Sequence, residues 1–122
     1  NTYFMTRAIE LLKNSFGVSQ LYQHDVIKDD KLIFSVYWHP LTIAERESIT
    51  QKSNENDVND FALSLMITKA LDKDGNRLFQ DGDKASLRRE VEANILQEIQ
   101  LAMIEAGQTR EVKEAKADLK SK

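Results

Sequence analysis

One stretch of this chain places large apolar side chains at every second position, and it lies between segments with a helical period. Leu32, Phe34, Val36 and Trp38 follow this alternation, which predicts a strand with one buried face. Pro40, the only proline, ends the strand because it offers no N–H to a neighbouring strand. An earlier stretch over 21–27 pairs with it across the polar residues 28–31, which predicts a small antiparallel hairpin with a four-residue loop.

Helices are expected on both sides of this hairpin. Before it, four apolar residues share one face of an amphipathic helix that Gly17 ends, namely Met5, Ile9, Leu12 and Phe16. After it, Thr42 and Glu45 form a T-x-x-E capping box, in which the hydroxyl and the carboxylate each accept a bond from a free backbone N–H. This box predicts a short helix over 43–50.

The second half of the chain is expected to hold two more helices. The first runs over 58–71 and carries apolar residues on two faces. Acidic turns at 72–76 and 81–83 follow, around a short extended piece. Asp83 is expected to cap a long final helix that keeps its period up to Gly107, and Arg88 to pair with Glu92 one turn further along it.

The expected fold is therefore mainly α with a small β-hairpin, an α+β single domain over residues 1–107 with a long C-terminal helix. The chain has 122 residues, the length of one ordinary domain, and a core is feasible at this size without disulfides. From 108 to 122 the composition shifts to charged residues, with Val112 and Leu119 as the only large aliphatic side chains. We expect this tail to be flexible unless a partner orders it.

The motifs indicate no catalytic, cofactor-binding or metal-binding residues. The chain has no cysteine and two histidines, His24 and His39, neither in a known catalytic or metal-ligand spacing. Asp72 and Asp74 resemble the start of an EF-hand loop, but Arg77 stands where that loop requires glycine. No glycine-rich phosphate loop is present. We expect no enzyme activity, no cofactor and no metal, so a small hydrolase or metal-binding protein has almost no support.

Charge and hydropathy argue against two classes of partner. Seventeen Lys and Arg face twenty Asp and Glu, so the chain has a net charge of −3 and no positive excess to neutralise phosphates. Acidic residues flank the aromatic strand, which favours a core or protein contact over base stacking. No apolar run approaches the roughly 20 residues of a membrane span. We expect no nucleic acid and no membrane as partner, and a cytoplasmic location.

Two of the predicted helices carry more apolar surface than one buried face requires. Leu63 and Ile67 form a second face on the helix over 58–71, and Leu101 and Ile104 lie off the main stripe of the final helix. Such surface indicates self-association or a partner interface, because monomeric domains rarely expose contiguous apolar patches. The alternative is a helix that is covered on both faces within one domain. The pattern favours neither, and we take the four residues as candidate partner-binding residues.

The order of these features resembles the tail assembly chaperones of bacteriophages with long, non-contractile tails. The resemblance covers approximately residues 8–107. It rests on W-H-P-L-T-I-A-E-R from Trp38 to Arg46, on D-K-D-G-N-R-L-F from Asp72 to Phe79 and on the long closing helix. It implies a non-enzymatic protein of the host cytoplasm that binds the tape measure protein and keeps it soluble while the tail tube assembles around it.

The resemblance also implies further partners. Some family members have a frameshifted, extended form that recruits the tail tube protein, and the charged tail lies where such an extension would begin. Self-association along the tape measure protein is expected as well. The alternative is a bacterial adaptor or regulatory domain that uses the same surplus apolar surface to bind one stable partner.

Overall fold

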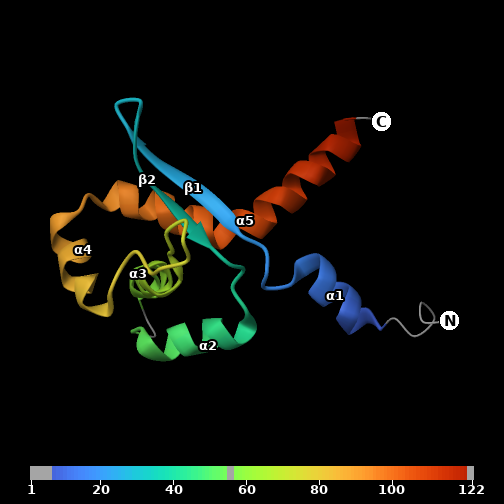
Figure 1. Ribbon diagram of the computed structural model, residues 1–122, viewed down its shortest axis with the longest axis horizontal. Helices are drawn as coiled ribbons and strands as arrows, with labels where there is room; N and C mark the ends of the chain where they lie inside the picture. The colour runs from blue at the N-terminus through green and yellow to red at the C-terminus, as the bar shows by residue number, and fades with distance from the viewer. Residues whose placement is uncertain (1–6, 55–56, 121–122) are drawn as a thin grey trace.

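The computed structural model describes residues 7–54 and 57–120, with side chains up to residue 106. It has an N-terminal helix, a β-hairpin and four further α-helices, which confirms the expected α+β class (Figure 1). The elements are α1 (Ala8–Phe16), β1 (Tyr22–Lys28), β2 (Lys31–Trp38), α2 (Ile43–Lys52), α3 (Val58–Lys69), the 3-10 helix η2 (Asp81–Asp83), α4 (Lys84–Glu90) and α5 (Ala93–Lys120).

The two strands form an antiparallel sheet in which Tyr22 lies opposite Trp38 and Lys28 opposite Lys31. The connecting turn has two residues, Asp29 and Asp30, with φ of 52° and 65°. Positive φ at both positions is typical of the tight turns whose twist matches that of a hairpin. The expected four-residue loop is therefore wrong, because both lysines pair within the ladder.

Helix α2 begins at the predicted capping box. The Thr42 hydroxyl accepts from the Glu45 N–H at 3.1 Å, and the Glu45 carboxylate accepts from the Thr42 N–H at 3.1 Å. Glu45 also pairs with the Lys69 ammonium at 2.8 Å, which ties α2 to α3. Partial burial works to raise the pKa of Glu45, but the hydrogen bonds from Lys69 and Thr42 outweigh it and lower that pKa. One carboxylate thus both starts a helix and fixes it to its neighbour.

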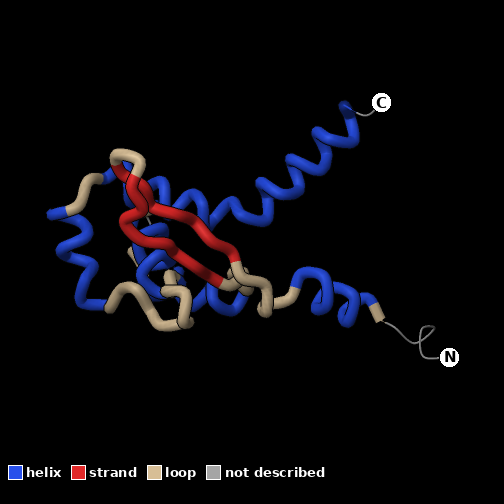
Figure 2. Tube along the Cα trace, turned by 45° about the horizontal axis from the view of Figure 1, so that its top comes forward, coloured by secondary structure: helices blue, strands red, loops and turns tan. Residues whose placement is uncertain are grey.

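Helix α3 is the centre of the core. Its residues 62–67 are all buried, and it contacts α2, α4 and α5 (Figures 1 and 2). The Asp57 carboxylate caps its start by accepting from the N–H groups of Asn59 and Asp60. On the hairpin, Val26, Val36 and Trp38 face the same core. The two apolar faces seen in the sequence are therefore both covered, as in a helix placed between layers.

The Asp60 carboxylate connects the start of α3 to α4 through ion pairs. Its buried carboxylate lies 2.8 Å from the Lys84 ammonium and 3.4 Å from the Arg88 guanidinium, and it accepts the Asn54 N–H at 2.8 Å. The hydrogen bond from Lys84 is the main reason that the pKa of Asp60 is lowered. The expected pairing of Arg88 with Glu92 is wrong, because Arg88 reaches across to α3.

The segment after α3 extends the sheet by one bridge. Leu71 exchanges both backbone hydrogen bonds with Tyr37, at 2.7 and 2.9 Å. The predicted turn at 72–76 is confirmed. In it, the Asp72 carboxylate accepts from the N–H groups of Asp74 and Asn76, and Gly75 adopts a φ of 86°. The Asp72 side chain therefore stabilises the turn.

The expected single long final helix is wrong in two ways. Val91 is extended, with φ −122° and ψ 138°, so the chain forms α4 and α5 instead of one helix. The break lets Leu87 on α4 and Leu96 on α5 both enter the core. Asp83 does not cap α4, since its carboxylate accepts the Gln80 N–H at 2.8 Å.

Helix α5 continues past the position where we expected it to end. It runs without interruption through Gly107 to Lys120, and the side chains of the charged tail lie outside the described residues. Figure 1 shows its C-terminal half leading away from the body of the molecule. Within the described residues, no helix combines the length and the apolar character that crossing a membrane requires.

Candidate functional site

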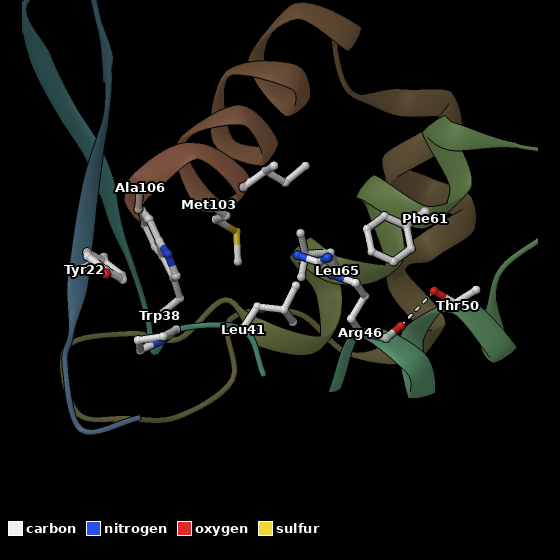
Figure 3. Close-up of a pocket in the computed structure, with 11 residues that line it drawn as sticks. Tyr22, Trp38, Leu41, Arg46, Thr50, Phe61, Leu65, Met103 and Ala106 are labelled. Atoms are coloured by element: carbon white, nitrogen blue, oxygen red, sulfur yellow. Dashed lines mark hydrogen bonds between the residues drawn. The ribbon is translucent and has the colours of Figure 1, made fainter. Parts of the chain in front are cut away.

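An apolar groove of about 680 Å³ lies between the end of the hairpin, α2, α3 and α5. We call it the Trp38 groove. Trp38 and Met103 line one side, and Phe61 and Leu65 of α3 line the other, with Leu41 below (Figure 3). The Tyr22 ring lies behind Trp38 with ring centroids 5.9 Å apart. A groove of this size and lining suits the apolar side chains of a partner segment.

One buried hydrogen-bond donor beside this groove has no acceptor in the described part of the chain. Trp38 is buried, and its indole N–H finds no partner in the described part of the chain. Figure 3 shows the indole nitrogen on the groove side of the ring and Arg46 reaching from α2 into the space opposite. The guanidinium of Arg46 forms no ion pair with any described side chain. The buried indole N–H is therefore an exception to the usual pairing of buried donors, whereas the exposed Arg46 guanidinium is open to solvent.

The structure separates the four candidate partner-binding residues. Leu63 and Ile67 are each 4% exposed and belong to the core cluster, so their assignment to a free surface is wrong. The covered-helix alternative explains this face of α3. Leu101 and Ile104 are 51% and 44% exposed on α5, and Ile104 lines the Trp38 groove. A partner-binding role of Leu101 and Ile104 stays a prediction.

The groove itself was missed by the sequence reasoning, except for Ile104. Its lining comes from five separate places along the chain, among them Tyr22, Leu41, Arg46 and Phe61. The available signal was the tryptophan that ends the predicted strand directly before the only proline. A large aromatic side chain at the end of a strand can line a site, but the other residues that line this groove come from distant helices.

The amphipathic helix α1 forms a second unpartnered surface. It is present as predicted from Ala8 onward, while Met5 lies outside the described residues. None of its residues is buried, and Ile9, Leu12 and Phe16 are all exposed on one face. The apolar stripe that predicted this helix therefore has no partner in the described part of the chain.

Both histidines have structural partners. The His24 ring lies 2.7 Å from the Glu98 carboxylate and links β1 to α5. The His39 Nδ1–H donates to the backbone carbonyl of Gln20 at 2.8 Å, because a carbonyl oxygen can only accept. In the described ranges no three side chains of the metal-ligating types gather in one place. The two histidines and their partners therefore support the fold. The surfaces available to a partner are the apolar groove and the exposed helix faces.

Comparison of the chain with protein-family models, with curated proteins and with solved structures gave no match.

Proposed function

We propose that this protein is a tail assembly chaperone of a bacteriophage with a long, non-contractile tail. It binds the tape measure protein in the host cytoplasm, keeps it soluble and promotes assembly of the tail tube around it. The observation that carries this proposal is the exposed apolar surface of α5, which Leu101 and Ile104 form, with Ile104 also lining an open apolar groove.

A tape measure protein consists of long helices whose apolar stripes aggregate in water unless another surface buries them. A small helical module with an exposed apolar strip on a long helix can bind such a stripe helix against helix. The net charge of −3 adds solubility to each bound copy. Many copies along one tape measure protein then keep it in solution.

The tail tube protein enters the same proposal as a second partner. A frameshifted, extended form of the chain would carry the segment that recruits it, as the family resemblance implies. Helix α5 runs without a break to Lys120. The charged residues 108–122 then separate the tape measure-binding surface from the recruiting segment.

Co-expression of the chain with the tape measure protein encoded beside it tests the proposal. We expect the tape measure protein to become soluble and to co-elute with several copies of this chain on size exclusion. Leu101→Asp is expected to reduce the soluble fraction, because it places a charge in the strip that covers the client. Val58→Asp is the control, since Val58 is also an exposed apolar residue and lies in the first turn of α3, where aspartate is favourable.

Two results would contradict the proposal. The first is a tape measure protein that stays insoluble while this chain elutes alone, which favours an adaptor with one different partner. The second is an equal effect of Leu101→Asp and Val58→Asp, which removes the α5 strip from the binding surface. The circular dichroism of each variant alone shows whether its fold is intact.

A further inference from the structure

Strand β1 pairs only with β2 in the described part of the chain, so its other side is a sheet edge (Figure 2). The bonds of Tyr37 show which residues face that edge. Tyr37 exchanges both backbone hydrogen bonds with Leu71, so its N–H and C=O point away from β1. Gln23 lies opposite Tyr37 and therefore points its own groups away from β2. Asp25 and Ile27, at every second position, do the same.

We call the backbone groups of Gln23, Asp25 and Ile27 the β1 edge. Outside the hairpin, no described backbone group forms a hydrogen bond with them, and all three residues are exposed. Proteins commonly protect such an edge with a proline or a bulge. Here the irregularity of the hairpin lies in β2, where Ile33 has no opposite residue, so the β1 edge stays regular.

The core of the molecule holds this edge in place. Val26 is 5% exposed and belongs to the core cluster. The His24 ring lies 2.7 Å from the Glu98 carboxylate on α5. A strand that pairs with β1 therefore meets an edge that is already ordered, which lowers the entropic cost of binding.

The side chain of Asp25 places a negative charge at the centre of the edge. It accepts hydrogen bonds from the Ser35 hydroxyl at 2.7 Å and the Gln23 amide at 2.8 Å, and both lower the pKa of Asp25. Its carboxylate forms no ion pair with any described side chain. Antiparallel pairing of two copies over all three positions would place Asp25 opposite Asp25. Because like charges directly opposite each other are destabilising, this edge disfavours a second copy and favours a cationic partner.

The end of the edge near the hairpin turn is apolar. Ile27 lies opposite Leu32, and the two side chains are 57% and 60% exposed. We propose that the β1 edge binds an extended segment of another protein by strand addition, with an apolar residue opposite Ile27 and lysine or arginine opposite Asp25. Backbone hydrogen bonds supply affinity in this mode, and alternate side chains supply specificity. The proposal concerns the hairpin and is independent of the α5 surface and of the chaperone function.

Amide hydrogen exchange, followed by NMR on the full chain, tests the pairing residue by residue. The probe is a ten-residue synthetic peptide of alternating valine and threonine in which lysine replaces one central valine. Without the peptide, the amides of Gln23, Asp25 and Ile27 should exchange faster than those of His24 and Val26, which bond to β2. The peptide should slow exchange at the first three positions. Protection that leaves these three amides unchanged overturns the proposal.

Reversal of the charge tests the specificity, with fluorescence anisotropy of the labelled peptide as the measurement. Wild type should bind the lysine peptide about tenfold more tightly than the same peptide with glutamate in that position. Asp25→Lys should reverse this preference, and Asp25→Asn, which retains the shape of the side chain, should abolish it. Glu47→Lys is the control, since it changes the net charge equally at an exposed site on α2. It should keep the wild-type preference.

Four further results would overturn the proposal. The lysine peptide fails to bind the wild-type chain, or it binds equally well when the backbone nitrogens that face β1 are methylated. Asp25→Asn and Asp25→Lys both keep the wild-type preference for lysine. The amides of Gln23, Asp25 and Ile27 become protected as the protein concentration rises without any peptide, which would place a second copy on the edge.

Discussion

Replacement of Asp60 by asparagine tests whether the charge at the start of α3 holds two helices together. Asparagine has nearly the same shape and still accepts the Asn54 N–H, so the substitution removes little besides the negative charge. In the wild type that charge faces Lys84 at 2.8 Å and Arg88 at 3.4 Å. Asp60→Asn leaves both cations without their anion at the junction of α3 and α4.

The expected loss of stability in Asp60→Asn follows from the two short contacts of the carboxylate. A hydrogen bond to a charged group contributes about 1 kcal/mol more than a neutral one, so the Lys84 and Asn54 bonds together predict a loss of about 2 kcal/mol. The longer contact to the half-exposed Arg88 adds little. For a domain of this size, a loss of that size lowers the melting temperature by about 8 °C.

The pH dependence of this loss has a defined sign. The folded-state pKa of Asp60 lies below its unfolded value of about 3.9. The stabilisation is therefore complete above the unfolded pKa and is lost as the pH falls through the folded pKa. The difference between wild type and Asp60→Asn should be constant at neutral pH and should shrink below about pH 4.

Urea denaturation at pH 7 and at a series of acidic pH values measures both effects. Asp81→Asn is the control, because Asp81 pairs with Arg77 at 3.0 Å but is largely exposed, so the loss of its charge should change the stability little. A cycle of Asp60→Ala, Lys84→Ala and the double variant isolates the coupling between the two side chains. The Asp60 charge does not hold α3 to α4 if Asp60→Asn destabilises the fold no more than Asp81→Asn, or if the effect of Asp60→Asn persists unchanged in acid.

Two further substitutions test the core and the capping box by the same denaturation assay. Met66→Ala should destabilise the fold by about 2–5 kcal/mol, because Met66 is fully buried in α3; the same truncation at the exposed Ile43 should change stability by less than about 0.5 kcal/mol. Thr42→Ala should cost about 1 kcal/mol, since it removes the acceptor for the Glu45 N–H; an unchanged midpoint would show that the box contributes nothing.

Local patterns predicted the elements whose causes are local. The alternation before Pro40 gave β2, and the spacing of Thr42 and Glu45 gave the start of α2, because each depends on residues within one turn or one strand. The hairpin turn was misjudged by two residues. Its signal was present in Asp29 and Asp30, since aspartate is among the few residue types that accept positive φ.

Features with distant causes could not be predicted in the same way. The break at Val91 exists because Leu87 and Leu96 must both reach a core formed with the hairpin and α3. Leu63 and Leu101 are the same residue type on helices with surplus apolar positions, yet one is buried and the other exposed. Periodicity reports which residues are apolar, whereas only the packing of other elements decides which of them are covered.

The absence of buried residues in α1 has a consequence for hydrogen exchange. Local opening costs little free energy where few contacts are lost, so the amides of α1 should exchange close to the rate of an unfolded peptide. Those of residues 62–67 in α3 should exchange only when the whole domain unfolds. The amides of α1 and α3 thus differ in their protection from hydrogen exchange. Slow exchange of the α1 amides would therefore identify molecules in which the N-terminal helix contacts a surface outside their own core.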